Sequence, residues 1–177
     1  MPLSEGVCLR PLNEEDAAEL HALIDLNRAR LAVWLPWAAG QTLDDTAKFI
    51  RRTRRQLMGN DGFQTAIVRK GAIAGVVGYL GVDWQNRSTS LGYWLDESSQ
   101  GKGAMTLAVQ ALVNHALSVW RLNRVEIRVA EENRRSRAIP ERLGFSQDGI
   151  LPGSESINGR YLDVVVYSTL AADWRAE

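Results

Sequence analysis

The amino-acid sequence predicts one domain of mixed α/β structure, and three observations support this. The chain has 177 residues, the usual size of a single compact domain. Its composition, 45% hydrophobic and 24% charged residues, is that of an ordinary globular protein. A meander of strand-like segments is followed by a strand-helix-strand unit, a further helix and a last strand. Since no repeat, linker or low-complexity segment is evident, residues 1–177 are expected to form a single domain.

The N-terminal half combines two helices with a run of strands. Asn13 is an N-cap candidate followed by acidic residues, and Lys70-Gly71 and Asn86-Arg87 have the composition of turns. β-branched and aromatic residues are frequent in the segments around these turns. The expected elements are a strand over 7–12, a helix over 14–24, a Trp-rich loop at 34–37, a helix with apolar positions Ala47, Ile50 and Leu57, and strands over 63–69, 73–82 and 89–95.

In the C-terminal half the period of the apolar residues changes. Apolar residues recur at helical spacing from Met105 to Trp120. Turn residues occur at Pro152-Gly153 and at Asn158-Gly159, just before the final segment. The expected elements are a helix over 105–120, a strand over 125–129, a helix over 136–143 and a long strand over 160–170.

Charge and cysteine content argue against several classes of protein. Lys and Arg number 21 and Asp and Glu number 21, so no net charge is available to hold DNA or an anionic membrane. The single Cys8 cannot form an internal disulfide, and there is no signal-like segment or apolar run of ~20 residues. His21 and His115 stand in helices without a second ligand at metal spacing. We therefore expect a cytoplasmic protein with no nucleic-acid, membrane or metal partner.

The segment from Gln100 to Thr106 has the properties of an anion site. It leaves the strand that ends at Leu95 and enters the most regular helix of the chain. The first N–H groups of a helix lack intrahelical partners and the helix dipole is positive there, while Gly101 and Gly103 remove side chains that would keep phosphate oxygens away. The segment fits neither the Walker A pattern, since Gly103 follows Lys102, nor the dinucleotide fingerprint, which needs a third Gly. A plain glycine-containing entry to a helix is the alternative.

Two motifs resemble those of the GNAT acetyltransferases. Gln100-Gly101-Lys102-Gly103-Ala104-Met105 resembles the pyrophosphate-binding motif of that superfamily, Gln/Arg-x-x-Gly-x-Gly/Ala, except that Met105 replaces Gly or Ala. Asn133-Arg134-Arg135-Ser136 with Leu143-Gly144-Phe145 resembles its Asn-x-x-Ser … Leu-Gly-Phe stretch. More narrowly, segments 34–37, 92–96, 101–106 and 158–163 resemble the RimJ/RimL branch, the ribosomal-protein N-terminal acetyltransferases and their relatives, in which Met105-Thr106 is normal.

The resemblance extends from Val7 to Leu170 and implies the GNAT fold, a mixed and mostly antiparallel sheet of about seven strands with helices on both faces. It implies that the strand ending near Asp96 splays from the strand at 125–129, and that the pantetheine of acetyl-coenzyme A (acetyl-CoA) inserts between them. Lys102 or one of Arg134, Arg135 and Arg137 is expected to meet the adenosine 3′-phosphate. The residues implied to bind acetyl-CoA are Trp94, Leu95, Asp96, Gln100, Gly101, Lys102, Gly103, Ala104, Met105, Thr106, Asn133 and Ser136.

The resemblance also implies which residues are catalytic. Glu155, before a turn and the last strand, matches by position a Glu proposed as the general base in RimL-like enzymes, although a loop Glu is usually only solvated. Ser136 is placed near the cofactor sulfur, and it is also a candidate cap for the helix that it begins. Pro140 stands where many GNAT enzymes have a Tyr that returns a proton to the leaving thiolate, so that role falls to Ser136 or to water.

The expected activity is direct transfer of acetyl from acetyl-CoA to a primary amine. The RimJ/RimL resemblance points to the N-terminal α-amine of a protein such as a ribosomal protein. Trp37 and Trp34 flank Pro36 and are candidate walls of the acceptor site, with core packing as the alternative. Two other functions stay open: acetylation of a small amine such as a polyamine, an aminoglycoside or an amino acid, and a non-catalytic coenzyme A-binding module. The oligomeric state is also open, a homodimer included.

Overall fold

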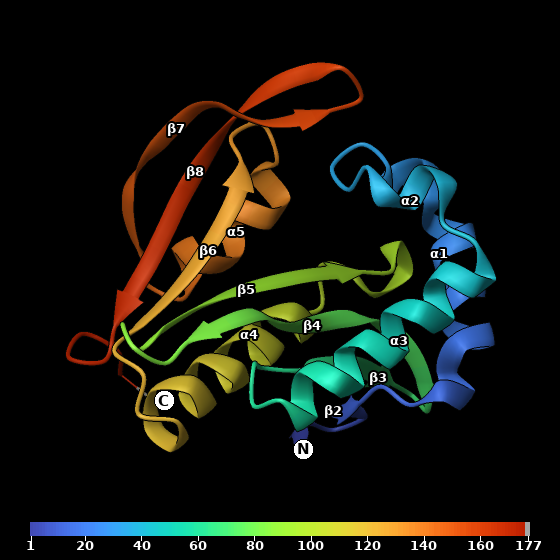
Figure 1. Ribbon diagram of the computed structural model, residues 1–177, viewed down its shortest axis with the longest axis horizontal. Helices are drawn as coiled ribbons and strands as arrows, with labels where there is room; N and C mark the ends of the chain where they lie inside the picture. The colour runs from blue at the N-terminus through green and yellow to red at the C-terminus, as the bar shows by residue number, and fades with distance from the viewer. Residues whose placement is uncertain (176–177) are drawn as a thin grey trace.

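A sheet of eight strands forms the centre of the molecule. In the computed structural model, which describes residues 1–175, the strands follow the order β1-β2-β3-β4-β5-β6-β8-β7 (Figure 1). Neighbouring strands are antiparallel except for β5 and β6, which run parallel. The strands are β1 (Pro2–Ser4), β2 (Val7–Pro11), β3 (Gln64–Arg69), β4 (Ala72–Asp83), β5 (Ser88–Leu95), β6 (Arg124–Ala130), β7 (Ser146–Ile157) and β8 (Arg160–Leu170).

Helices cover both faces of this sheet (Figure 1). On one face, Ile24 of α1 and Ile50 of α3 are buried against β3 and β4. On the other face, Val109 and Leu112 of α4 are buried against β4 and β5. The expected mixed, mostly antiparallel sheet with helices on both faces is therefore confirmed. The helices are η1 (Glu14–Asp16), α1 (Ala17–Leu31), α2 (Trp37–Gly40), α3 (Leu43–Met58), η2 (Glu97–Ser99), α4 (Ala104–Asn114), the π-helix η3 (His115–Val119) and α5 (Arg134–Arg142).

Helix α1 begins where the sequence predicts but ends later. Asn13 and Asp16 exchange side-chain to backbone hydrogen bonds, and this capping box starts η1 and leads into α1. The helix expected over 14–24 is too short, because α1 continues to Leu31. The next buried position after Ile24 carries the polar residue Asn27, which interrupts the apolar pattern. The Trp-rich segment that follows is also not all loop, since α2 forms within it.

Strand β7 is not predicted by the sequence pattern. Ten of its twelve residues are exposed, so the alternation of a half-buried strand is missing, and the strand forms because its main chain pairs with β8. Pro152-Gly153 does not form the expected turn but lies where the pairing register shifts between Leu151 and Glu155. Glu155 therefore lies within a strand, opposite Leu162, and not in a loop. With β1, which is also unpredicted, the sheet has eight strands where about seven were expected.

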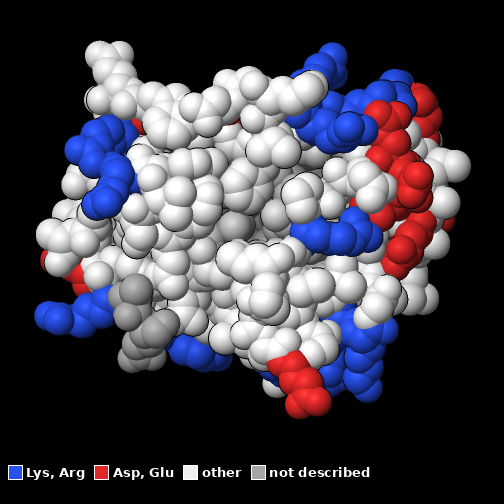
Figure 2. All heavy atoms as spheres, turned by 90° about the horizontal axis from the view of Figure 1, so that it is seen from below, with Lys and Arg blue, Asp and Glu red and all other residues white. Residues whose placement is uncertain are grey.

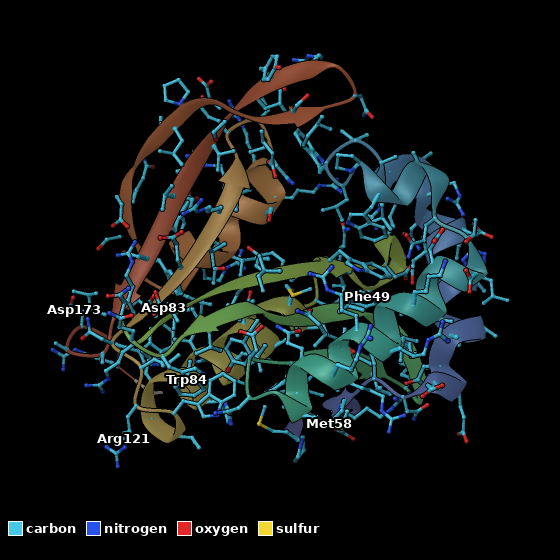
Figure 3. All side chains as sticks on the ribbon, in the orientation of Figure 1. Phe49, Met58, Asp83, Trp84, Arg121 and Asp173 are labelled. Carbon is cyan, nitrogen blue, oxygen red and sulfur yellow. The ribbon has the colours of Figure 1, made fainter. Side chains whose placement is uncertain are left out.

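The helix expected over 105–120 changes geometry at its end. The buried Tyr79 hydroxyl donates a hydrogen bond of 2.7 Å to the Leu112 carbonyl oxygen, which gives this carbonyl a partner outside the helix. The chain then forms η3, in which the Trp120 N–H bonds to the His115 carbonyl at 3.2 Å, five residues back. Phe63, Tyr79, His115 and Trp120 pack edge to face or tilted around this point. Trp84, labelled in the lower part of Figure 3, packs against Trp120. The aromatic cluster fixes the end of α4 on the sheet.

Charged side chains are distributed over the surface in both signs. On the lower face of the molecule, uncharged residues fill the centre while Lys, Arg, Asp and Glu lie around the margin (Figure 2). At one edge of that view basic and acidic residues are neighbours. Among residues 1–175, no helix is long and apolar enough to cross a membrane.

Candidate active site

The pairing between β5 and β6 ends early, and this opens a gap in the sheet. Only Ser88 to Ser90 of β5 pair with Arg124 to Glu126 of β6, although β5 continues to Leu95 and β6 to Ala130. Beyond the paired residues the two strands separate (Figure 1). We name this opening the fork. It agrees with the expected splay of the parallel pair, and it leaves main-chain groups of β5 without a strand partner on that side.

Two residues of β5 present their main-chain groups to the fork. The Asp96 N–H donates to the Ala74 carbonyl of β4 at 2.7 Å. Because main-chain groups alternate between the two edges of a strand, Trp94 also points its groups toward β4, while Tyr93 and Leu95 point theirs into the fork. Of Trp94, Leu95 and Asp96, which were expected to bind acetyl-CoA at this strand, Leu95 offers main-chain groups to the fork, whereas those of Trp94 and the Asp96 N–H go to β4. Tyr93 is a further candidate. Tyr93 was not predicted from the sequence, because the edge of the strand that a residue's main-chain groups face is known only once the pairing register is known.

The Gln100 to Thr106 loop has the geometry of an anion site. Gly101 has a φ of 71° and Gly103 a φ of 77°, a left-handed conformation that favours glycine. Gly103 is the N-cap of α4, and its carbonyl accepts the Leu107 N–H at 3.1 Å. This is the first hydrogen bond of the helix, so the N–H groups of the residues before Leu107 have no intrahelical partner, as in any α-helix. A Cβ atom on either glycine would meet nothing within 4 Å, so the space in front of these N–H groups is open.

Helix α5 begins at the edge of the fork, two residues earlier than expected. The helix starts at Arg134, and the Asn133 side chain caps it by accepting the Ser136 N–H at 3.2 Å. The expectation that Ser136 caps this helix is wrong, because Asn133 stands at the N-cap position. Arg137 is engaged in the fold, since it donates to the Tyr167 hydroxyl at 2.9 Å and to the Glu131 carbonyl at 3.0 Å.

Pro140, the departure from the family pattern, has a structural consequence at the fork. Proline has no N–H, so Pro140 leaves the Ser136 carbonyl, four residues earlier in α5, without its helical partner. The Tyr93 hydroxyl donates to that carbonyl at 3.0 Å. Burial raises the pKa of Tyr93, so the hydroxyl keeps its proton at neutral pH. A side chain of β5 thus binds α5 across the fork.

A second set of contacts surrounds the Leu95 carbonyl at the open end of the fork. Arg30 of α1 donates to this oxygen at 2.7 Å, and the Gln100 side-chain amide donates to it at 3.3 Å. Arg135 of α5 donates to the side-chain oxygen of Gln100 at 3.1 Å. These contacts connect α1, β5, the glycine loop and α5. Arg30 could not be identified from a local sequence pattern, because its partner Leu95 is 65 residues away.

Asp96, the residue after Leu95, holds the same region in place through hydrogen bonds of its side chain. Its buried carboxylate accepts a hydrogen bond of 2.8 Å from Asn27 and a second one from the Ser98 hydroxyl. Burial would raise the pKa of Asp96, but the hydrogen bonds from Ser98 and Asn27 and the charge of Arg30 hold this pKa below its usual value. The carboxylate is therefore ionised and structural.

The hairpin of β7 and β8 closes the site on the acceptor side. The Asn158 amide at its tip donates to the Ala32 carbonyl at 3.0 Å, after the end of α1. Trp34 packs against the buried residues Ala130, Ile157 and Leu162. A cleft of about 160 Å³ remains there; Trp34, and not Trp37, lines it with Val33, Glu132, Ile157, Asn158, Arg160 and Leu162. Trp37 lies in α2 and is 41% exposed.

Glu155 lies on the face of the hairpin that carries this cleft. Ile157 is two residues further along β7, and Leu162 is directly opposite Glu155 on β8, so all three side chains are on one face. A larger cleft of about 510 Å³ lies at the closed end of the fork, where the paired residues of β5 and β6 contribute Ser90, Arg124 and Glu126. Within residues 1–175 no group of three or more His, Cys, Asp or Glu side chains is arranged to hold a metal ion.

The sheet with its fork and the glycine loop at the start of α4 define a class of acyl-transfer protein, and comparison with known proteins agrees. The family model described as "Acetyltransferase (GNAT) domain" matches residues 7–146. The chain therefore belongs to the GNAT acetyltransferase family, and the expectation of an N-acetyltransferase that uses acetyl-CoA is confirmed.

Three relatives illustrate the range of this similarity. The chain is 34% identical to YdaF of Bacillus subtilis (strain 168) over 177 residues, which cover 99% of this chain and 97% of YdaF. It is 29% identical to spermidine N(1)-acetyltransferase of Escherichia coli (strain K12), covering 93% and 86% of the two chains. The solved structure of RimL, a ribosomal L7/L12 alpha-N-protein acetyltransferase in complex with coenzyme A, superimposes with a TM-score of 0.92 at 29% identity, covering 96% of each chain.

The first prediction tests the glycine loop. Acetyl-CoA at about a hundred times its dissociation constant should raise the free energy of unfolding by about 2.7 kcal/mol. Gly103→Glu should remove this gain, because its carboxylate would oppose the pyrophosphate. Gly71→Glu is the matched control for backbone strain, since Gly71 also has a positive φ and open space in the β3-β4 turn. Thermal unfolding with and without acetyl-CoA measures both; an unchanged shift in Gly103→Glu would show that the pyrophosphate binds elsewhere.

The second prediction tests the link between Tyr93 and Pro140. Tyr93→Phe should lower the free energy of unfolding by about 1 to 2 kcal/mol, because the Ser136 carbonyl loses its partner. Pro140→Ala supplies a main-chain N–H for that carbonyl, so Tyr93→Phe should cost less in the Pro140→Ala background. Urea unfolding of the two single variants and the double variant gives the coupling energy. Additive effects would mean that the two residues act independently.

Proposed function

We propose that this enzyme transfers acetyl from acetyl-CoA to the α-amine of a protein N-terminus, such as that of a ribosomal protein. The observation that carries the proposal is the closed acceptor side, where Asn158 bonds to Ala32 and Trp34 packs under the hairpin. A chain end can enter such a narrow cleft, whereas an internal segment of a folded protein would have to lie across it. The similarity to RimL, named as an alpha-N-protein acetyltransferase, supports the same acceptor.

The fork and the glycine loop provide the acetyl donor site. The N–H groups of the first turn of α4 are suited to bind the pyrophosphate. Tyr93 and Leu95 offer main-chain groups to the two amides of pantetheine. The N–H groups of Tyr93 and Leu95 face the fork, whereas the Asp96 N–H is bonded to Ala74, so at the end of β5 the donor on offer is that of Leu95 and not that of Asp96. We therefore assign the Leu95 N–H to the acetyl oxygen, which gains negative charge as the amine attacks.

Glu155 is the proposed general base. Its place beside Ile157 and Leu162, on the face of the hairpin that carries the cleft, supports this role. The amine nitrogen forms a bond to the acetyl carbon, the carbon-sulfur bond breaks, and the amine proton passes to Glu155, through a water where needed. The coenzyme A thiolate takes a proton from the Ser136 hydroxyl or from water, because Pro140 replaces the Tyr that serves many relatives.

Acetylation of a small amine is the second candidate. The observation in its favour is the size of the cleft beside Trp34, about 160 Å³, together with the similarity to spermidine N(1)-acetyltransferase. Release of coenzyme A in the presence of each acceptor separates the two candidates.

The third prediction concerns the acceptor. An α-amine has a pKa near ~7.7 to 8.0 and a Lys amine near ~10.4, so the free base of Lys costs roughly 3 to 4 kcal/mol more at neutral pH. Peptides that begin with Ser or Ala should therefore be acetylated in preference to an N-blocked peptide containing Lys, and in preference to spermidine. Coenzyme A release and mass spectrometry over this panel give the answer. Rapid acetylation of spermidine with none of the peptides would establish the small-amine function instead.

The fourth prediction concerns the base. Glu155→Gln should lower kcat by about a hundredfold or more, as for a lost general base, and should leave acetyl-CoA affinity nearly unchanged. The rate of the native enzyme should rise with pH as the acceptor amine loses its proton, and the variant should follow the same rise at its lower rate. Glu132→Gln is the matched control, because Glu132 lines the same cleft. If Glu132→Gln loses activity and Glu155→Gln keeps it, the base is Glu132.

A further inference from the structure

One buried donor beside the fork has no hydrogen-bond partner within residues 1–175. Among the described residues 1–175, Arg30 Nε is the buried side-chain nitrogen that donates to no protein group. Donors removed from solvent are nearly always hydrogen-bonded in native proteins, and one that is not calls for an explanation such as a role in catalysis or a bound water or ion. The remaining contacts of this guanidinium, through its Nη2 atom, go to the Leu95 carbonyl at 2.7 Å and to the Asn27 side-chain oxygen at 2.8 Å.

These contacts fix where Arg30 lies. The Leu95 carbonyl faces the fork, so the guanidinium bonded to it stands at the open end, beside the N–H assigned to the acetyl oxygen. Helix α1 lies on the opposite face of the sheet from α4, whose first turn holds the anion site. Arg30 therefore reaches the Leu95 carbonyl from the α1 side of the sheet, while Gln100 of the glycine loop reaches the same oxygen. The chain leaves α1 after Leu31 and turns directly to Trp34, which lines the acceptor cleft.

We propose that Arg30 binds the first carbonyl oxygen of the acceptor chain, and so selects amines that stand next to a carbonyl group. This inference rests on the proposed function and names the feature by which the site would recognise an α-amine. Such a carbonyl lies two bonds from the amine nitrogen in every peptide N-terminus. It is missing from polyamines and from the end of a Lys side chain.

The chemistry of the guanidinium fits this role better than a role in cofactor binding. A planar guanidinium has donors in fixed directions, so it would hold the acceptor carbonyl oxygen in a defined position beside Leu95. Burial lowers the pKa of Arg30, while Glu97 and Asp96 oppose that change and Arg135 adds to it. An arginine remains charged at neutral pH in spite of such shifts. Its charge is partly balanced by the ionised Asp96, so the position favours a neutral carbonyl over a free carboxylate.

The test compares two acceptors that differ only at the first carbonyl. The probes are a short peptide that begins with Ser and the same peptide with its first amide replaced by a trans-alkene, which keeps the shape and removes the oxygen. In the native enzyme, kcat/KM for the alkene should be lower by about 10- to 100-fold, the effect of one lost hydrogen bond to a charged group. Arg30→Ala should lower kcat/KM for the peptide by a similar factor and leave that for the alkene within about twofold.

Matched variants separate recognition from loosening of the fold. Arg28→Ala is the control, because Arg28 is a partly buried arginine on the same helix that bonds to the Ala38 and Gln41 carbonyls. It should affect both acceptors equally. Arg30→Lys keeps the positive charge without the planar guanidinium, and it replaces Arg30→Ala if the latter does not fold. The acetyl-CoA thermal shift should persist in each variant.

The outcomes also distinguish this inference from the proposed function. If the native enzyme acetylates neither peptide nor alkene, the proposed function fails. If it acetylates the peptide and the alkene equally well, or if Arg30→Ala lowers both rates by the same factor, the proposed function stands and the role of Arg30 is refuted.

Discussion

The early end of the β5-β6 pairing is the constraint on which the rest of the site depends. Three residue pairs hold the parallel strands together, and the later residues of β5 then have main-chain groups without a strand partner. Buried main-chain groups must be hydrogen-bonded somewhere. The protein meets part of this demand with side chains, since Arg30 and Gln100 bind the Leu95 carbonyl, and leaves the rest for a ligand with amide groups of its own.

A sheet divided in this way needs contacts that hold its two halves together. Tyr93 binds the Ser136 carbonyl on the side of α5, and Trp34 packs into the apolar cluster of Ala130, Ile157 and Leu162 on the other side. Pro140 explains why the first contact exists, because it frees the carbonyl that Tyr93 uses. In the proposed mechanism the same proline leaves the coenzyme A thiolate to take its proton from Ser136 or from water. One residue thus shapes the structure of the fork and, by that proposal, its chemistry.

Local features were predictable from the sequence, and distant partnerships were not. The glycine loop was found because glycine conformation and free helix N–H groups are properties of a short segment. Strand β7 was missed because its exposed residues have no period and its partner β8 alone defines it. Asn27 looked like the end of a helix because Asp96, which makes its burial possible, is 69 residues away. Arg30 and Tyr93 were missed for the same reason. The available signal was Asn27 itself, a polar residue at a core position of α1.

Arg30 and Glu155 would affect the acceptor amine in opposite directions. A carboxylate near the amine favours the charged ammonium form, whereas a guanidinium near it favours the neutral form that can attack. In the proposed arrangement, with Arg30 at the acceptor carbonyl and Glu155 on the cleft face of the hairpin, the positive charge would lie closer to the acetyl oxygen and the negative charge closer to the entrance. An ammonium group would be attracted at the entrance and would lose its proton as it approached Arg30. An α-amine, whose pKa is already near ~8, needs only a small shift of this kind, whereas a Lys amine near ~10.4 needs one that a single half-buried arginine does not supply. Selection for α-amines would then follow from the same two charges that bind and deprotonate the acceptor.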